Sequence, residues 1–267
     1  MRWGMFILGG LMLIACGFFI RGVRWLIVLG LPFDRQSFWQ SFRANGAASG
    51  LASLTPFQLG EILKIHMMRT SGTDTWKERV PALFVERVMD LAGVAGVGLC
   101  GLCTQFDLTW PALIALLLPV WSGQLLYLLG SLTRYLPNRT QSYIGLLRHY
   151  HRMTAASLLT IMLWLLYAAL WWSAISAIHV TVGFGQVSIL LGGVMLTMIA
   201  SMTPAGLGVA ELGSQGILIW LGKSQAEAEA AAIALRLLTP LLVISGGLCL
   251  LPQLLHRLSK KPGSNSR

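Results

Sequence analysis

The chain has 267 residues, of which 55% are hydrophobic and only 11% are charged, and its mean hydropathy is +0.68. This composition excludes a water-soluble enzyme or binding domain, and several apolar runs approach the roughly 20 residues that cross a bilayer. The net charge of +10 comes from basic clusters that flank the apolar runs, which argues against a nucleic-acid partner. We therefore expect an all-α polytopic membrane protein.

The first half of the chain, residues 1–132, is predicted to form one membrane repeat. Its expected elements are a span at 3–20, a helix pair at 36–54 and 57–70, a span at 80–103 and a linking span at 110–132. Arg21 and Arg24 end the first span in this interpretation, and Trp25 is suited to the level of the lipid headgroups.

The second half repeats this plan after a basic cytoplasmic linker at 133–152. The second membrane repeat, residues 153–255, is expected to contain a span at 153–178, a helix pair at 186–201 and 205–221, and a final span at 228–251. The basic tail, residues 256–267, is predicted to be disordered.

A short motif links the two halves. Ser53-Leu54-Thr55-Pro56 and Gly60 recur as Ser201-Met202-Thr203-Pro204 and Gly208, at a shift of 148 positions. A proline that breaks a helix within hydrocarbon is tolerated only where protein or a water-filled cavity surrounds the break. Each half is therefore predicted to contain a proline-broken, re-entrant helical hairpin, although either copy alone would also fit a turn between two ordinary spans. The predicted hinge residues are Pro56, Gly60, Pro204, Gly206 and Gly208.

Counting spans predicts that the two repeats are inverted. A hairpin leaves the membrane on the face at which it entered, and three other spans lie between the starts of the halves, which is an odd number. The basic segments 21–43 and 64–79 belong in the cytoplasm, while 179–186 has no Lys, Arg, Asp or Glu. We expect an inner-membrane protein with its N-terminus outside and its C-terminus inside, and inverted repeats with broken helices are typical of secondary transporters.

Charged residues within apolar segments supply the candidate site. Each half has a carboxylate after the proline and an arginine on the following span, Glu61 with Arg87 and Glu211 with Arg236. These pairs either lock each hairpin to its neighbouring helix or line a groove that holds a headgroup. The predicted substrate-binding residues are Thr55, Glu61, Lys64, Arg87, Thr203, Glu211 and Arg236. Glu86 and Asp90 are expected to lie near water as anchors.

Enzyme chemistry has little support in the sequence, which contains no nucleophile elbow, phosphate-binding glycine loop or metal-binding box. Cys100 and Cys103 have metal-ligand spacing, but no further ligands lie nearby, so we interpret them as packing residues. We expect a protein that is not an enzyme and that has no cofactor and no metal.

Three groups of residues resemble one family. They are Pro56-x-x-x-Gly60-Glu61 followed by Lys64 and Arg69, then Glu86-Arg87-x-x-Asp90, and then Gly206-x-Gly208-x-x-Glu211 with Arg236. Together they resemble the flippase-like membrane domain of the lysylphosphatidylglycerol synthase family. Members often have an asparagine shortly before the first proline, where this chain has Ser53 and Thr55, and the departure leaves the substrate open.

The resemblance implies translocation of an anionic or polyprenyl-linked lipid across the cytoplasmic membrane. The soluble aminoacyl-transfer domain of the full synthases is lacking, so the chain is not expected to make lysyl-lipid itself. Two other functions remain open: an accessory membrane subunit of a glycosyltransferase or lipid-modifying enzyme, and a secondary transporter for a small anion. Membrane lipids are the expected partners.

Overall fold

The computed structural model describes residues 2–68, 75–132, 145–200, 203 and 206–259. Every regular element within these ranges is a helix, which confirms the predicted all-helical class. Arg69, Ser201, Met202, Pro204 and Ala205, residues 133–144 of the linker and residues 260–267 of the tail lie outside the described residues.

The first half contains seven helical elements and the second half contains six, counted over the described residues. Those of the first half are α1 (Arg2–Leu29), α2 (Arg35–Ala52), the 3₁₀-helix η1 (Pro56–Ile62), α3 (Leu63–Met67), α4 (Thr75–Gln105), α5 (Thr109–Leu116) and α6 (Leu118–Leu132). Those of the second half are the 3₁₀-helix η3 (Gly145–Arg148), α8 (Tyr150–Ala177), α9 (Phe184–Ala200), α10 (Val209–Trp220), α11 (Gln225–Arg236) and α12 (Leu238–Ser259).

Three helical stretches of the described chain are long and apolar enough to cross a membrane: Ile7–Leu29, Tyr150–Ala177 and Gln225–Pro252. A fourth is obtained if α5 and α6, which meet at an angle of 43°, form one bent span. These stretches support a membrane protein with helical spans.

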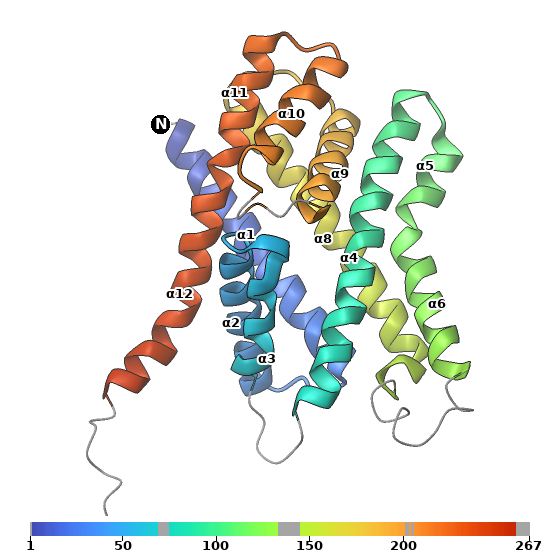
Figure 1. Cartoon of the computed structure of the whole chain (residues 1–267), viewed down its shortest axis with the longest axis vertical. Coiled ribbons are helices and arrows are strands. Elements are labelled where there is room, and N and C mark those ends of the chain that lie inside the picture. Colours follow the sequence, from blue (N-terminus) through green and yellow to red (C-terminus); the bar gives the residue numbers. More distant parts are fainter. Residues whose placement is uncertain (1, 69–74, 133–144, 201–202, 204–205, 260–267) are drawn as a thin grey trace, which may run out of the picture.

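The two predicted hairpins occupy opposite ends of the molecule (Figure 1). The helices α2 and α3 lie side by side in the lower half, joined by η1 at mid-height, whereas α9 and α10 lie in the upper half. The long helices α1, α4 and α8 run past both regions. As a result, the ends of the two helix pairs face each other near the middle of the bundle.

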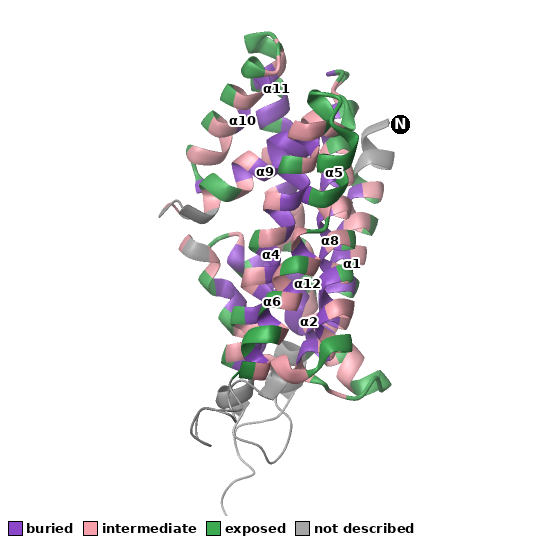
Figure 2. Cartoon of the chain, turned by 90° about the vertical axis from the view of Figure 1, so that its right-hand side faces the viewer, coloured by how far each residue is buried: buried purple, intermediate pink, exposed green. Residues whose placement is uncertain are grey.

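Packing contacts join the two halves. The helix α2 packs against α12, α4 packs against α9, and α1 packs against α8. Buried residues concentrate on the inner helices, whereas the rim around α5 is more exposed (Figure 2). The first helix of each pair therefore packs against a long helix of the other half: α2 packs against α12, and α9 packs against α4.

Small residues allow the contact between α2 and α12. The segment from Ala44 to Gly50 is buried, and its Gly50 faces Gly246. A Cβ atom added to Gly246 would lie 2.6 Å from the carbonyl oxygen of Gly46 and 2.8 Å from Cα of Gly50. The structure places these two helix backbones in contact, as a Gly-, Ala- and Ser-rich helix allows inside a membrane.

Asp34 is the N-cap of α2. Its carboxylate accepts hydrogen bonds from the backbone N–H and the hydroxyl of Ser37. These bonds, the backbone one first, hold the pKa of Asp34 below its usual range. Asp34 thus satisfies one of the unpaired N–H groups at the start of the helix.

The first helix differs from its prediction. It continues to Leu29 without a break at Arg21 or Arg24, because the apolar sequence after Arg24 extends the helix into the core. Trp25 is fully buried, and Nζ of Lys64 lies 4.4 Å from the centre of its ring. The prediction that Trp25 lies at the headgroup level is therefore wrong.

Two boundaries also differ. The predicted helix at 57–70 begins as a 3₁₀-helix and its α-helical part ends at Met67. At the other end of the chain, α12 continues to Ser259, so the first residues of the predicted disordered tail are helical.

The glycine contact between α2 and α12 gives a first prediction. Gly246→Ala should lower the melting temperature in detergent, because overpacking a close backbone contact costs about 1–3 kcal/mol. Gly247 is the matched control, since a Cβ atom there meets nothing within 4 Å. Gly247→Ala should leave the melting temperature unchanged or raise it, because alanine favours a helix by up to about 1 kcal/mol relative to glycine. Equal melting temperatures for the two variants would contradict the contact.

Candidate functional site

A cavity of about 440 Å³ lies between the two helix pairs. Its lining comes from α1, α2, η1 and α4 of the first half and from α8, α9, α10, α11 and α12 of the second. Most of its lining residues are apolar, but charged side chains reach it from both halves. The charged lining residues are Arg21, Glu61, Arg87, Asp90, Glu211 and Arg236.

The turn before η1 brings charged residues to the cavity. Pro56 occupies the first turn of η1, and the backbone N–H of Gly60 donates to Oγ1 of Thr55 over 2.8 Å. Gly60 packs so closely that an added Cβ would lie 2.3 Å from the backbone nitrogen of Ala52. This folding of η1 onto α2 places Glu61 between α1 and α4.

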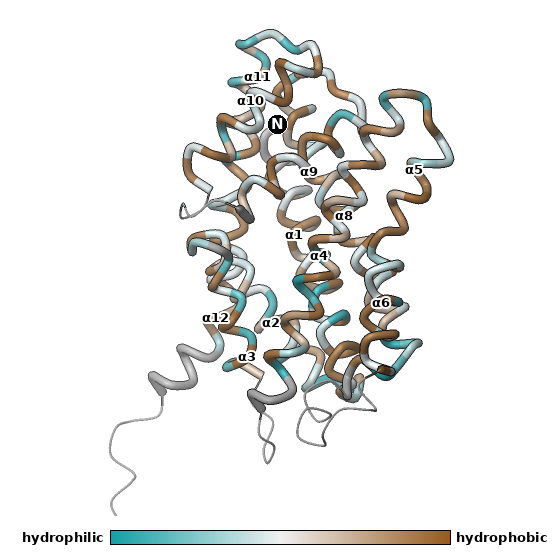
Figure 3. Tube along the Cα trace, turned by 45° about the vertical axis from the view of Figure 1, so that its right-hand side comes forward, coloured by the Kyte–Doolittle hydropathy of each residue, from teal (hydrophilic) through white to brown (hydrophobic). Residues whose placement is uncertain are grey.

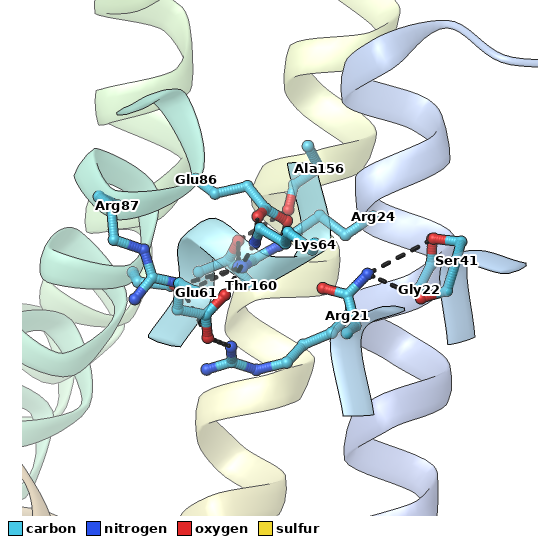
Figure 4. A network of polar contacts seen from close by, with 12 residues as sticks. Arg21, Gly22, Arg24, Ser41, Glu61, Lys64, Glu86, Arg87, Ala156 and Thr160 are labelled. Atoms are coloured by element: carbon cyan, nitrogen blue, oxygen red, sulfur yellow. Dashed lines mark hydrogen bonds and ion pairs between the residues drawn. The ribbon is translucent and has the colours of Figure 1, made fainter. Parts of the chain in front are cut away.

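Glu61 is the centre of one group of ion pairs (Figure 4). Its Oε1 lies 2.7 Å from Nη1 of Arg21 and 3.7 Å from Nη2 of Arg87, and its Oε2 lies 3.0 Å from Nζ of Lys64. Arg21 also donates from Nε to the hydroxyl of Tyr167 on α8 over 3.1 Å. The carboxylate therefore joins the first hairpin to α1, α4 and, through Arg21, α8.

Arg24 is the centre of a second, deeper group. It contacts Glu86 at 3.2 Å and Asp90 at 2.6 Å, and it donates to Oγ1 of Thr160 over 2.9 Å. Glu86 also pairs directly with Lys64, which connects the two groups. The side chains of Arg24, Lys64 and Glu86 have no exposed surface. We call the seven charged residues of both groups the ion network: Arg21, Arg24, Glu61, Lys64, Glu86, Arg87 and Asp90.

The ion network carries a net positive charge. Four cations face three carboxylates, which leaves one positive charge in excess. Removing a charge from water costs several kcal/mol per ion, and the cost is offset only by close pairing and further hydrogen bonds. The hydrophilic stretches of α3 and α4 lie among mainly hydrophobic helices (Figure 3).

Among the described residues of the second half, Glu211 and Arg236 form an ion pair at the cavity. Nε of Arg236 on α11 lies 3.2 Å from Oε1 of Glu211 on α10, and both side chains are about a quarter exposed, at 27% and 28%. Oε2 of Glu211 accepts a hydrogen bond from the backbone N–H of Gly208 over 2.8 Å. Glu211 therefore caps the start of α10 and also holds Arg236. Gly208, with a φ of 79°, and Gly206, with a φ of 62°, precede this helix.

Comparison with known proteins gives one family. A family model described as the lysylphosphatidylglycerol synthase transmembrane region matches residues 1–247. The chain belongs to the lysylphosphatidylglycerol synthase transmembrane-region family. No curated protein and no solved structure matches the chain.

In this family member, the structure brings together the residues that the sequence predicted as pairs. Glu61 lies beside Arg87, and Glu211 lies beside Arg236. Thr55 and Thr203 line the cavity, and Lys64 lies behind it within the ion network. The role of each residue in substrate binding stays a prediction, as does the role of each hinge residue.

Sequence reasoning missed four of the seven residues of the ion network. Arg21 and Arg24 were assigned to the end of a span and Glu86 and Asp90 to anchors near water, whereas all four are buried. The anchor prediction is wrong because α4 passes through the bundle beside α1, so its charged turn meets the arginines of α1. The apolar run after Arg24 was the available signal, since it continues the helix and so places both arginines inside it.

No metal site is found among the residues that the structure describes, since they contain no group of three His, Cys, Asp or Glu side chains that could hold an ion. Cys100 and Cys103 are partly buried free thiols near the end of α4.

The two halves of this family member differ in their charges. At shifts of 148 to 150, which relate Pro56 to Pro204, Arg87 to Arg236 and Glu61 to Glu211, no position that corresponds to Arg24, Lys64, Glu86 or Asp90 carries a residue of the same charge. The first hairpin is thus joined to α1 and α4 by a buried network, whereas Glu211 and Arg236 provide the corresponding contact of α10. We conclude that the ion network belongs to one half only.

This difference predicts unequal effects on stability. Glu86→Gln leaves buried Arg24 and Lys64 short of a carboxylate, and breaking a buried pair in this way costs about 3–5 kcal/mol. Glu211→Gln breaks a partly exposed pair, which is expected to cost about 1 kcal/mol or less. Thermal unfolding in detergent should therefore show a much larger loss for Glu86→Gln. A loss of equal size in both variants would mean that the buried network does not anchor the first half.

Proposed function

We propose that this protein moves the headgroup of an anionic membrane lipid between the two leaflets of the cytoplasmic membrane, through the cavity between its two helix pairs. The observation that carries the proposal is the lining of that cavity, in which charged side chains from both halves are found among mostly apolar residues. Membership of a transmembrane-region family named for a lipid synthase supports a lipid substrate. The protein makes or breaks no bond in this role.

The proposal includes an inverted repeat. Its two hairpins are re-entrant, with α2–η1–α3 entering from the cytoplasm and α9–α10 entering from the opposite face. In such a repeat α2 corresponds to α9 and α12 corresponds to α4. The contact of α2 with α12 then corresponds to the contact of α9 with α4, and both contacts are present, which supports the proposal. The shift of 148 that relates Pro56 to Pro204 also relates Gly98 to Gly246, and both glycines lie in these contacts.

The cavity can replace water around a charged headgroup. A headgroup that crosses hydrocarbon alone loses its hydration, and the cost for one charge at the centre is roughly 2.5–3.5 kcal/mol on insertion scales and more in simulations. Arg87 and Arg236 are the arginines with appreciable exposure at the cavity, at 28% and 27%. They lie on opposite halves, so the headgroup can pass from one arginine to the other as access changes between the leaflets.

A second role is favoured by the family description. Because the matching model describes the transmembrane region of a synthase, the chain could serve as the membrane partner of a separate lipid-modifying enzyme. Stoichiometric co-purification of such an enzyme, together with no lipid movement by the isolated chain, would favour this role over transport.

Transport can be tested in liposomes. The purified chain should accelerate exchange of a headgroup-labelled anionic phospholipid between the leaflets, and Arg236→Ala should slow this exchange by about tenfold or more, since a charge-assisted contact contributes about 1.5–3 kcal/mol. Arg35→Ala is the control, because Arg35 is exposed and lies outside the cavity. The proposal fails if wild type moves no lipid, or if the two variants behave alike. Uptake of free phosphate without lipid movement would instead indicate a small-anion transporter.

The inverted arrangement has its own test. Single cysteines replace Phe33 and Phe184, which are both exposed and lie at the starts of α2 and α9. In a background without the four native cysteines, a membrane-impermeant reagent should label position 33 only from the cytoplasmic side and position 184 only from the other side. Labelling of both positions from one compartment would exclude the inverted repeat.

A further inference from the structure

We infer that Gln58 is a positioning residue: its side chain holds the guanidinium of Arg87 at the cavity, and this contact offsets a left-handed backbone conformation that glycine adopts more readily. The effect of Gln58 on lipid movement rests on the proposed function. The contact with Arg87 and the backbone conformation behind it are tested without that function.

Gln58 has a backbone conformation that few residues with a side chain adopt. Its φ is 54°, in the left-handed region, where the Cβ atom of an L-residue crowds the following carbonyl oxygen. Asp107 and His179 are the other described residues besides glycine with a positive φ. Each follows the end of a long helix, α4 or α8, where a left-handed residue commonly closes the last turn. Gln58 lies within η1 instead, so a helix end does not explain its conformation.

The second half has a glycine at the matching position. The shift of 148 that relates Pro56 to Pro204 also relates Gln58 to Gly206, and Gly206 has a φ of 62°. Both halves therefore place a left-handed residue two positions after the proline. Glycine adopts this conformation without strain because it has no Cβ atom. A glutamine in the first half is less favourable for the backbone, so its side chain must supply a compensating contact.

That contact is with Arg87 on α4. Oε1 of Gln58 accepts a hydrogen bond from Nη1 of Arg87 over 2.9 Å. Nη2 of the same guanidinium donates to Oδ2 of Asp90 over 2.8 Å and lies 3.7 Å from Oε1 of Glu61. All four of these residues line the cavity, and the side chain of Arg87 is 28% exposed. Gln58 therefore supplies the acceptor of Nη1, while the carboxylates face Nη2.

A neutral amide fixes the position of Arg87 without adding a counterion. Hydrogen bonds to charged groups are stronger than those between neutral groups, so this contact is sufficient to offset an unfavourable backbone conformation. A carboxylate at position 58 would also hold the arginine, but it would reduce the positive charge that the arginine brings to the cavity. In the second half, Gly206 has no side chain to offer and Arg236 pairs with the carboxylate of Glu211. The amide contact is thus a feature of the first hairpin.

Two truncations of Gln58 test the backbone conformation. Gln58→Ala and Gln58→Gly both remove the contact with Arg87, but only glycine relieves the left-handed backbone. The Gly variant should melt about 2–4 °C above the Ala variant in detergent, the shift expected from one left-handed residue in a chain of roughly this size. An equal or higher melting temperature for Gln58→Ala would overturn the inference, because alanine is the more stable residue at right-handed helical positions.

The neighbouring position is the matched control for these truncations. Leu59 is exposed and is not among the residues with a positive φ. Leu59→Ala should therefore melt at or above Leu59→Gly, the reverse of the order at position 58. The same order at both positions would mean that the left-handed backbone of Gln58 is not the cause, and the inference would be wrong.

The chemical reactivity of Arg87 tests the contact itself. Phenylglyoxal modifies arginine side chains, and mass spectrometry of the digested protein gives the rate at each position. Arg87 should react about tenfold faster in both truncations than in wild type, the factor that one hydrogen bond to a charged group contributes. Gln58→Glu keeps an acceptor of the same length, so Arg87 should react there no faster than in wild type. Exposed Arg35 provides the reference rate in every sample.

Two results of this modification experiment contradict the contact. The first is an unchanged rate at Arg87 in both truncations. The second is a rate in Gln58→Glu as high as in the truncations, since an acceptor at position 58 would then have no effect on Arg87.

Lipid exchange in liposomes separates positioning from a merely structural role and keeps the two proposals distinct. Gln58→Ala and Gln58→Gly should slow exchange of the headgroup-labelled anionic phospholipid by the same factor, although their melting temperatures differ. Exchange rates that follow the melting temperatures, or that equal wild type in both variants, would exclude a positioning role. If wild type moves no lipid, the proposed function fails, and the melting and modification results still decide whether Gln58 holds Arg87.

Discussion

The cost of burying charge governs this structure. Arg24, Lys64 and Glu86 have no exposed surface, so each must find its counterion within the protein. This requirement joins α3 to α4 through Lys64 and Glu86, and it joins α1 to α4 through Arg24. Ion pairs therefore join η1 and α3 to the first helix and to the charged turn of α4, and Arg21, Glu61, Arg87 and Asp90 of this network line the cavity.

The two halves are joined by close helix contacts but differ in their charges. Small residues allow α2 to pack on α12 and α4 to pack on α9, so the halves are in contact at two places. Only the first half carries the buried network, whereas the α10 side meets the cavity through the partly exposed pair of Glu211 and Arg236. In the proposed cycle the first hairpin stays in place, and the ion pair of Glu211 and Arg236 at the second hairpin separates to bind a headgroup.

The sequence predicts those parts of the structure that depend on local features. A proline within an apolar run and a recurrence at 148 positions are local features, so the helical class and the pairs Glu61–Arg87 and Glu211–Arg236 could be predicted, whereas the re-entrant hairpins stay a prediction. The partners of Arg24 could not be predicted, because its contacts with Glu86 and Asp90 join residues 62 and 66 positions apart and depend on how α1 crosses α4. Trp25 was assigned to the interface for the same reason: an aromatic residue beside arginines is typical of a headgroup region, and burial depends on the neighbours that packing supplies.

The central claim is that a lipid headgroup occupies the cavity between the two hairpins. The most direct measurement is a cryo-electron microscopy map of the chain in nanodiscs that contain phosphatidylglycerol, with a bound antibody fragment to aid alignment. The account predicts headgroup density between Arg87 and Arg236, with acyl chains leaving the cavity sideways into the bilayer. A cavity closed to the lipid by surrounding helices, with ordered lipid only around the outside of the protein, would contradict it.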